Sequence, residues 1–171
     1  MAGVMVNSII LVIVPLLTLT ADQMANIISA IQEHGSVEAQ HLDDLTPSQL
    51  RDDIVPRMDE IKYNSSSTMF IFTSPQQLVE HPFILDAILR CHARQTLRLV
   101  TIDEAHLYAM HGRSFRVAMR VLQRILFEVI FKEGVWHPLL LAMTATMTTP
   151  LLESFSTLTN VDWNAEDGNS L

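Results

Sequence analysis

Two short segments carry the side chains best suited to chemistry. Asp103–His106 (Asp-Glu-Ala-His) and Thr144–Thr146 (Thr-Ala-Thr) each follow an apolar run. Carboxylate oxygens suit Mg²⁺, and one carboxylate suffices when phosphate oxygens and waters complete the shell. A second carboxylate can then orient or polarise a water that attacks a phosphate. These residue types indicate phosphoryl transfer, with Asp103 as the metal ligand and Glu104 beside the water. The plainer alternatives are two solvated acids at a strand end and an ordinary turn at Thr144–Thr146.

The elements that must position these segments are short apolar runs separated by amphipathic segments. The runs, near-continuous in three of four cases, are typical of strands buried on both faces of a parallel sheet: Ile9–Val14, Met69–Thr73, Leu97–Asp103 and Leu139–Met143. Helical spacing predicts helices over Thr20–Gln32, Thr46–Met58, Glu80–His92, Phe115–Phe131 and Pro150–Thr159. The alternation of strands and helices predicts an α/β fold, a three-layer α/β/α arrangement around a parallel sheet with right-handed crossovers.

Two prolines refine the helix over Thr46–Met58. Pro47 suits its first helical position, and Pro56 is expected to end or bend it. Because ligands of open parallel sheets bind at the carboxyl ends of the strands, we expect the segments after Val14 and Thr73 to lie near Asp103. Each offers a loop and a helix start whose N–H groups suit a phosphate.

Composition limits the class of protein. The chain has 171 residues, 49% of them hydrophobic and 18% charged, which predicts one folded domain rather than a disordered chain. The net charge of −8 argues against a protein that coats nucleic acid by bulk charge. One cysteine, Cys91, excludes a disulfide framework and a Cys-rich zinc site, and it fits a reducing intracellular setting. Residues 1–21 carry no charge, but polar residues and Pro15 interrupt them, so we expect no membrane span.

Positive charge is concentrated between residues 90 and 124. This window holds seven arginines against two acids, Asp103 and Glu104. Four of the arginines recur at three- and four-residue spacing on the predicted helix, which places Arg113, Arg116, Arg120 and Arg124 in one stripe. The stripe could meet DNA phosphates, or it could be a solvated helix face.

The four strand ends, in their order, resemble the first motor domain of superfamily two helicases, and RecQ-type DNA helicases in particular. The similarity reaches to about residue 160. It is carried by VPLLTLTADQ at Val14–Gln23 (motif Ia), TSPQQL at Thr73–Leu78 (motif Ib), IDEAH at Ile102–His106 (motif II), AMTAT at Ala142–Thr146 (motif III) and HGRSFR at His111–Arg116, at the place of an aromatic-rich loop.

The resemblance implies a RecA-like domain that binds ATP with Mg²⁺. Asp103 would bind the Mg²⁺, and Glu104 would position the attacking water as the catalytic carboxylate. His106 would link the nucleotide site to motif III through Thr144 and Thr146. The family acts on DNA with 3′-to-5′ polarity in repair and recombination, in the nucleus of eukaryotes or otherwise in the cytoplasm.

The resemblance also implies contacts with single-stranded DNA or a partial duplex. Motif Ia and motif Ib residues would touch the sugar-phosphate backbone, and two residues of the aromatic-rich loop would sense the strand. The positions are Pro15, Leu16, Gln23, Ser74, Pro75, Phe115 and Arg116. RecQ-like proteins usually carry Ser-Gln-Trp where this chain has Ala109–His111, and an acidic and basic pair where it has Gln76 and Gln77.

One motif of the family is missing from the sequence. None of the five glycines is followed by lysine, so the chain contains no Gly-Lys-Ser/Thr phosphate-binding loop. We therefore expect residues 1–160 to be a partial first domain without its P-loop strand and helix, with a polar tail at 161–171. The second RecA-like domain would be a separate partner. A non-catalytic nucleic-acid- or protein-binding module is the rival interpretation, and a piece of a longer gene product is a third. Losing the P-loop strand should also leave Leu139–Met143 at a sheet edge.

Overall fold

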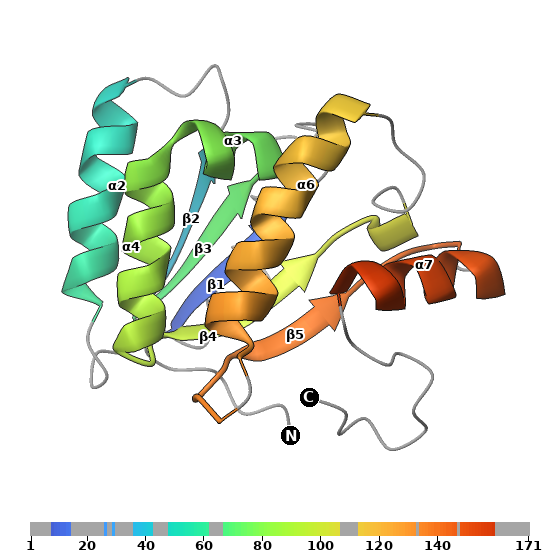
Figure 1. Ribbon diagram of the computed structural model, residues 1–171. Helices are drawn as coiled ribbons and strands as arrows, with labels where there is room; N and C mark the ends of the chain where they lie inside the picture. Colours follow the sequence, from blue (N-terminus) through green and yellow to red (C-terminus); the bar gives the residue numbers. More distant parts are fainter. Residues whose placement is uncertain are drawn as a thin grey trace.

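Five parallel strands form one sheet in this computed structural model. It describes residues 8–14, 26, 29, 36–42, 48–61, 67–106, 113–132, 134–146 and 148–159. The strands are β1 (Ser8–Ile13), β2 (Ser36–Leu42), β3 (Ser67–Thr73), β4 (Leu97–Ile102) and β5 (Leu139–Ala142). Their order across the sheet is β2-β3-β1-β4-β5 (Figure 1). The predicted α/β class is therefore confirmed, and among the described strands β5 is the predicted edge strand.

The four apolar runs all form strands at the expected places. β1 is buried along its whole length, because β3 and β4 flank it and its side chains are covered on both faces of the sheet. The sequence analysis missed β2. Its sequence, Ser-Val-Glu-Ala-Gln-His-Leu, lacks a continuous apolar run because it lies at an edge of the sheet and keeps polar side chains there.

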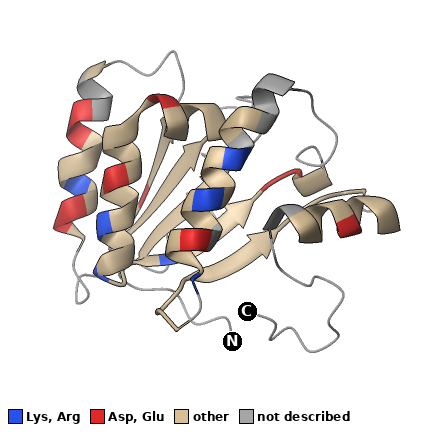
Figure 2. Cartoon of the chain, in the orientation of Figure 1, with Lys and Arg blue, Asp and Glu red and all other residues tan. Residues whose placement is uncertain are grey.

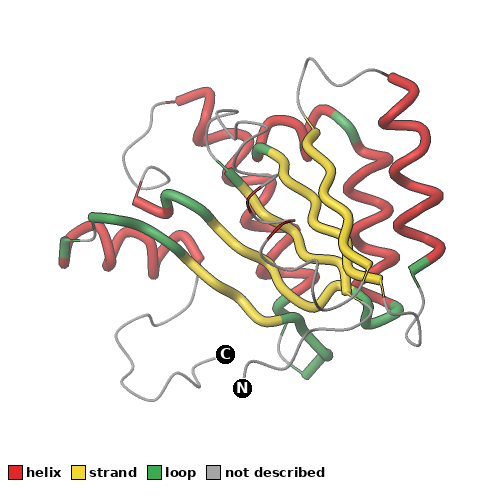
Figure 3. The backbone as a smooth tube through the Cα atoms, turned by 180° about the vertical axis from the view of Figure 1, so that it is seen from behind, coloured by secondary structure: helices red, strands yellow, loops and turns green. Residues whose placement is uncertain are grey.

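Helices cover one face of the sheet. α2 (Ser48–Glu60), α4 (Pro82–Ala93) and α6 (Arg113–Ile125) lie on the far side of the strands when the sheet is viewed from behind (Figure 3). The short α3 (Pro75–Glu80) precedes α4, a π-helical turn η2 (Leu126–Ile130) continues α6, and α7 (Thr149–Thr159) follows β5. The second face has its own apolar cluster around Ile10, Val12, Val14 and Phe72.

The helix predictions are confirmed for four of the five segments. Of the two effects expected of Pro56, ending the helix is wrong, and a bend at Pro56 stays a prediction. α2 continues through Pro56 to Glu60 instead of ending there. Proline removes one backbone hydrogen bond. Pro56 and Asp52, whose carbonyl loses its partner, are both exposed, so water can take the place of the missing bond. The fifth segment, Thr20–Gln32, lies outside the described residues except for Asn26 and Ser29, which are helical. That segment would form the third layer of the predicted α/β/α arrangement, so this part of the prediction lies outside the described residues.

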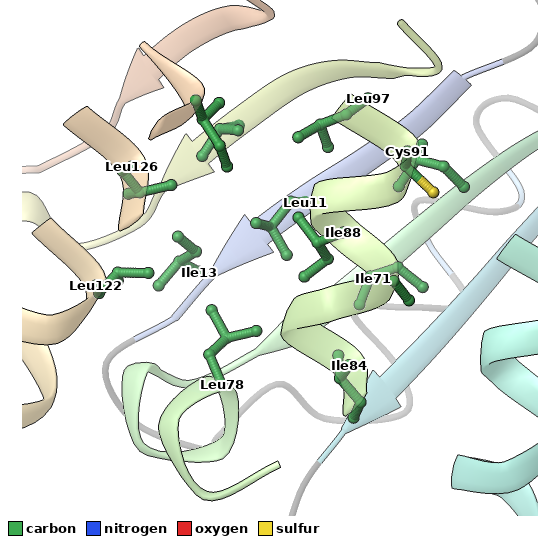
Figure 4. Close-up of a cluster of buried hydrophobic side chains, with 14 of the residues drawn as sticks. Leu11, Ile13, Ile71, Leu78, Ile84, Ile88, Cys91, Leu97, Leu122 and Leu126 are labelled. Atoms are coloured by element: carbon green, nitrogen blue, oxygen red, sulfur yellow. The ribbon is translucent and has the colours of Figure 1, made fainter. Parts of the chain in front are cut away.

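The main core lies between the sheet and the helices that cover it. Alternate side chains of the central strands, such as Leu11, Ile13 and Ile71, face the buried sides of α4 and α6 (Figure 4). From the helices come Ile88, Cys91, Leu122 and Leu126. This packing fixes the strands against each other, and therefore fixes the positions of the loops at their carboxyl ends.

Within the described ranges, no helix is long and apolar enough to cross a membrane. The predicted tail at 161–171 lies outside those ranges.

Candidate active site at the carboxyl ends of the strands

Backbone hydrogen bonds join the ends of four neighbouring strands, β3, β1, β4 and β5, into one rim. The Val14 N–H donates to the Thr73 carbonyl oxygen at 2.9 Å, and the Asp103 N–H donates to the Ile13 carbonyl oxygen at 2.9 Å. The Met143 N–H donates to the Ile102 carbonyl oxygen at 2.8 Å. These bonds continue the parallel pairing of β3, β1, β4 and β5 past the last paired residues. Along this rim, motif Ib, the first residue of motif Ia (Val14), motif II and motif III therefore follow one another in the order of the strands.

The turn after β4 holds Glu104 in an unusual backbone conformation. Glu104 has a φ of +46°, in the left-handed region that costs a side-chain-bearing residue about 1–2 kcal/mol. The Asp103 carboxylate accepts a hydrogen bond from the Glu104 N–H, with a distance of 2.8 Å from Oδ1 to N. This local bond supports the turn. Strain of this kind is concentrated at functional sites, where the surrounding structure holds it in place.

A side-chain hydrogen bond connects motif II with motif III. His106 Nδ1 lies 2.7 Å from Thr144 Oγ1. The Thr144 hydroxyl donates to the Thr146 carbonyl oxygen at 3.2 Å and accepts from the Thr146 N–H at 3.3 Å. Either His106 Nδ1 or the Thr144 hydroxyl can be the donor, depending on the tautomer of the imidazole. These hydrogen bonds connect His106, Thr144 and Thr146, and the predicted role of the three residues in linking a nucleotide site to motif III stays a prediction.

The two oxygens of Glu104 have different surroundings. Oε2 is enclosed, lies 3.3 Å from His106 Nδ1, and accepts no hydrogen bond from the described residues. The side chain as a whole is nevertheless 44% exposed, so its other oxygen faces outward. A buried carboxylate oxygen without a donor is unfavourable. Glu104 is therefore a strained residue whose carboxylate is incompletely hydrogen-bonded within the described part of the chain.

Asp103 and Glu104 fit the metal and water end of a MgATP site. Both are partly exposed at the strand end, and Mg²⁺ needs only one such carboxylate when phosphates and waters supply the other ligands. Among the described residues, no group of three or more His, Cys, Asp or Glu could hold a metal ion by itself. The phosphate end fits poorly, because no Gly-Lys-Ser/Thr segment is present in the sequence.

Motif Ib lies wholly within the described residues, from the last residue of β3 into α3. The Ser74 side chain accepts a hydrogen bond from the Gln77 N–H at 3.2 Å and caps α3, and Ser74 is only 3% exposed. Pro75 is buried at the first position of the helix. Both residues lie at the rim as expected, but their side chains serve the helix start. Whether they also touch a nucleic-acid strand stays a prediction.

The other nucleic-acid positions are described in part or not at all. Pro15, Leu16 and Gln23 lie outside the described residues. Phe115 and Arg116 belong to the first turns of α6, where only their backbone is described. Their predicted contacts with DNA therefore stay predictions.

The sequence analysis missed one contact within the site. The N–H of Ala105 donates to the Met143 carbonyl oxygen at 2.8 Å, and Ala105 is fully buried. Motifs II and III are therefore joined by backbone as well as by the His106–Thr144 bond. The available signal was the small residue between Glu104 and His106, because a fully buried position between two polar residues favours a small side chain.

Comparison with known proteins places the chain beside ATP-dependent helicases. It is 26% identical over 156 residues to RecS of Bacillus subtilis, named as an ATP-dependent DNA helicase, which aligns 91% of the chain with 27% of that protein. It is 30% identical over 138 residues to the ATP-dependent DNA helicase RecQ of Bacillus subtilis, covering 81% of the chain and 20% of RecQ. It is 31% identical over 142 residues to R290 of Acanthamoeba polyphaga mimivirus, named as an ATP-dependent RNA helicase, covering 81% of the chain and 21% of R290.

The chain thus spans about a quarter of the length of the curated relatives it matches. No protein-family profile matches it. Among solved structures, the Hef helicase domain of Pyrococcus furiosus aligns with 90% of the chain and 34% of its own, at 17% identity and a TM-score of 0.35.

Proposed function

Starting from the relationship of this chain to the RecQ-like helicases of superfamily two, we propose that it forms the part of an ATP-dependent DNA helicase motor that carries the hydrolysis carboxylates. The observation that carries the proposal is the shared rim. Asp103 and Glu104 end one strand, Thr144 follows its neighbour, and His106 joins the two through a 2.7 Å hydrogen bond. Metal-binding, water-positioning and relay groups belong together in a phosphoryl-transfer site.

Asp103 is the residue that would hold Mg²⁺, and Glu104 is the residue that would act on the attacking water. Bound Mg²⁺ would neutralise charge that develops on the phosphate oxygens. The outward oxygen of Glu104 can accept a proton from a water and fix its orientation toward the phosphate. Its inward oxygen stays near His106, which keeps the carboxylate from rotating away. Such positioned acid–base groups contribute about 10²–10⁴-fold to a rate.

The His106–Thr144 bond gives the site a route to the rest of the motor. His106 lies in motif II, and Thr144 lies in the segment that leads through Thr146 to α7. A displacement of that segment would move the imidazole beside Glu104. We assign His106, Thr144 and Thr146 the positioning role that couples hydrolysis to movement of the neighbouring segments.

The nucleic-acid side of the proposal follows the RecQ-like relatives. The strand would cross the rim over motifs Ia and Ib, at Pro15, Leu16, Gln23, Ser74 and Pro75, and would reach the start of α6 at Phe115 and Arg116. RecS and RecQ are named as DNA helicases, which supports DNA as the substrate. The 3′-to-5′ direction of translocation follows only from the resemblance of the motifs to RecQ-type helicases. R290 is named as an RNA helicase, so an RNA strand is the alternative outcome of the test.

A second candidate is a non-catalytic module, and the missing Gly-Lys-Ser/Thr segment favours it. In both cases the 171-residue chain by itself should show negligible ATP hydrolysis, because its residues do not provide the phosphate end of the site. The two candidates differ once the phosphate end is supplied by another segment. Robust DNA-stimulated hydrolysis by the isolated chain, lost in Glu104→Gln, would contradict the expected lack of activity and would rule out the non-catalytic module.

A chimera provides that test. The 138-residue stretch of Bacillus subtilis RecQ that this chain matches is replaced by this chain, and unwinding of a duplex with a 3′ or a 5′ single-stranded tail is measured. We expect ATP-dependent unwinding of the 3′-tailed DNA duplex. A folded chimera that binds DNA but unwinds neither DNA substrate nor the matching RNA duplexes would favour the non-catalytic module.

A further inference from the structure

The outward face of α6 alternates arginine with valine. Val117, Arg120, Val121 and Arg124 are all exposed, and their i, i+3, i+4, i+7 spacing places them on one side of the helix. We call these four residues the α6 stripe. The opposite side of α6 supplies Leu122 to the core. The stripe therefore lies on the solvent-exposed side of α6, and the opposite side of the helix packs into the core.

The remaining described arginines of the basic window are engaged within the fold. Arg90 and Arg94 both bond to Asp59, at 3.0 and 2.6 Å. Arg98 lies over the Trp136 ring, 5.6 Å from its centre. These three arginines hold elements of this chain together, so the positive charge that remains for other molecules lies on α6.

The two arginines of the stripe are available to a partner. Among the described residues, Arg120 makes no ion pair and Arg124 bonds only to Glu128, and the side chains of Arg124 and Glu128 are well exposed. Figure 2 shows basic turns along α6, with an acidic turn directly after them. Seventeen of the nineteen acids lie outside the 90–124 window, so this surface is basic on an acidic protein.

The two valines decide what kind of partner fits. Val117 is 61% exposed and Val121 is 37% exposed, and the aliphatic stems of the arginines flank them. A phosphate backbone would pair with the arginines but would gain nothing from valine methyl groups. A helix that alternates acidic and apolar side chains would use both, because its turns repeat at the same 5.4 Å pitch as α6.

We propose that the α6 stripe is a docking site for an acidic amphipathic helix of a protein partner. Glutamate or aspartate side chains would pair with Arg120 and Arg124, and leucine-like side chains between them would cover Val117 and Val121. The stripe lies on the helical layer that covers the sheet face, whereas the hydrolysis residues lie at the strand ends, so the proposal does not depend on the helicase proposal.

Fluorescence anisotropy with three labelled probes tests the docking site on the full chain. The first probe is a helical peptide of about 18 residues with alternating leucine and glutamate faces. The second has the same charge with every leucine replaced by serine, and the third is an oligothymidylate of about 20 nucleotides. At physiological salt we expect the leucine-glutamate peptide to bind about tenfold more tightly than the serine peptide.

Substitutions on α6 locate the binding. Arg120→Glu and Val121→Ser should each weaken the leucine-glutamate peptide about tenfold, whereas Lys132→Glu, an exposed charge reversal beyond the stripe, should change it less than about twofold. Urea denaturation of each variant shows whether the fold is intact, and Val117→Ser provides a second apolar test. Equal binding of both peptides, an unaltered affinity in Arg120→Glu, or tighter binding of the oligothymidylate through Arg120 would each overturn the proposal.

Discussion

Two places in the fold bring charged side chains from different elements together. One is Asp59 with Arg90 and Arg94, which we call the Asp59 clamp, and the other is the rim at Asp103–His106. The charged groups of the clamp bond to each other, whereas a carboxylate oxygen at the rim receives no hydrogen bond from the described residues. At the clamp, which joins α2 to α4, the Asp59 carboxylate receives hydrogen bonds from Arg90 and Arg94. The hydrogen bond from Arg90 holds the pKa of Asp59 below its ordinary value, against the burial that would raise it. At the rim, Glu104 is strained and one of its oxygens accepts no hydrogen bond from the described residues.

The difference teaches which cluster is structural and which is functional. A group whose hydrogen bonds are complete within the chain has nothing left to offer a ligand. A group that is held in an unfavourable conformation with incomplete hydrogen bonds does not stabilise the fold, which indicates a role in function. The comparison predicts that substitutions at the clamp destabilise the fold, whereas suitable substitutions at Glu104 stabilise it.

The largest stability effect should come from the clamp. Asp59→Ala removes the partner of two arginines and should lower the free energy of unfolding by about 1–2 kcal/mol, measured by urea denaturation. Asp86→Ala is the matched control, because Asp86 is 68% exposed and pairs only with Arg90 along the same helix. Its cost should stay below about 0.5 kcal/mol. Equal effects of the two substitutions would show that the clamp is an ordinary surface ion pair.

A smaller effect of opposite sign is expected at the rim. Glu104→Asn introduces a residue that tolerates the left-handed region and should raise the free energy of unfolding by about 0.5 kcal/mol. Glu104→Gln keeps the length of the side chain and the strain, so it should leave stability nearly unchanged. Thermal denaturation followed by circular dichroism compares the two. A loss of stability in Glu104→Asn would contradict the assignment of strain to this residue.

The smallest effect is the pH dependence of the clamp. Because the pKa of Asp59 is lower in the folded chain than in the unfolded chain, its stabilising contribution is complete above the unfolded value and is lost as the pH falls through the folded value. The stability gap between the wild type and Asp59→Asn should therefore narrow from about pH 6 to about pH 3. A gap that stays constant over this range would show that Asp59 acts by packing rather than by charge.

Most of the fold could be predicted, because buried strands appear in the sequence as apolar runs. β1 and the apolar centre of β3 are continuous runs, and β5 was found although Leu139 and Leu141 are exposed in the structure. β2 was missed because an edge strand needs no continuous run. Pro56 was misjudged because a proline on the exposed side of a helix can leave its carbonyl partner to water.

The candidate site could be predicted at the level of residues but not of geometry. The identities of Asp103, Glu104, His106 and Thr144 indicated their chemistry, and the parallel sheet predicted a common rim. Neither the positive φ of Glu104 nor the backbone hydrogen bond between Ala105 and Met143 could be predicted, because residue types alone do not show how the turn after β4 meets the distant segment after β5. The capping role of Ser74 also depends on how tightly α3 follows β3.

DNA-stimulated ATP hydrolysis by the RecQ chimera tests the central claim most directly. The proposed role of Glu104 predicts that Glu104→Gln lowers the hydrolysis rate by at least about 100-fold while nucleotide and DNA binding persist. Glu153→Gln on α7, which is exposed and away from the rim, should leave the rate unchanged. A Glu104→Gln chimera that hydrolyses ATP as fast as the unsubstituted chimera would contradict the assignment of the hydrolysis carboxylate to this rim.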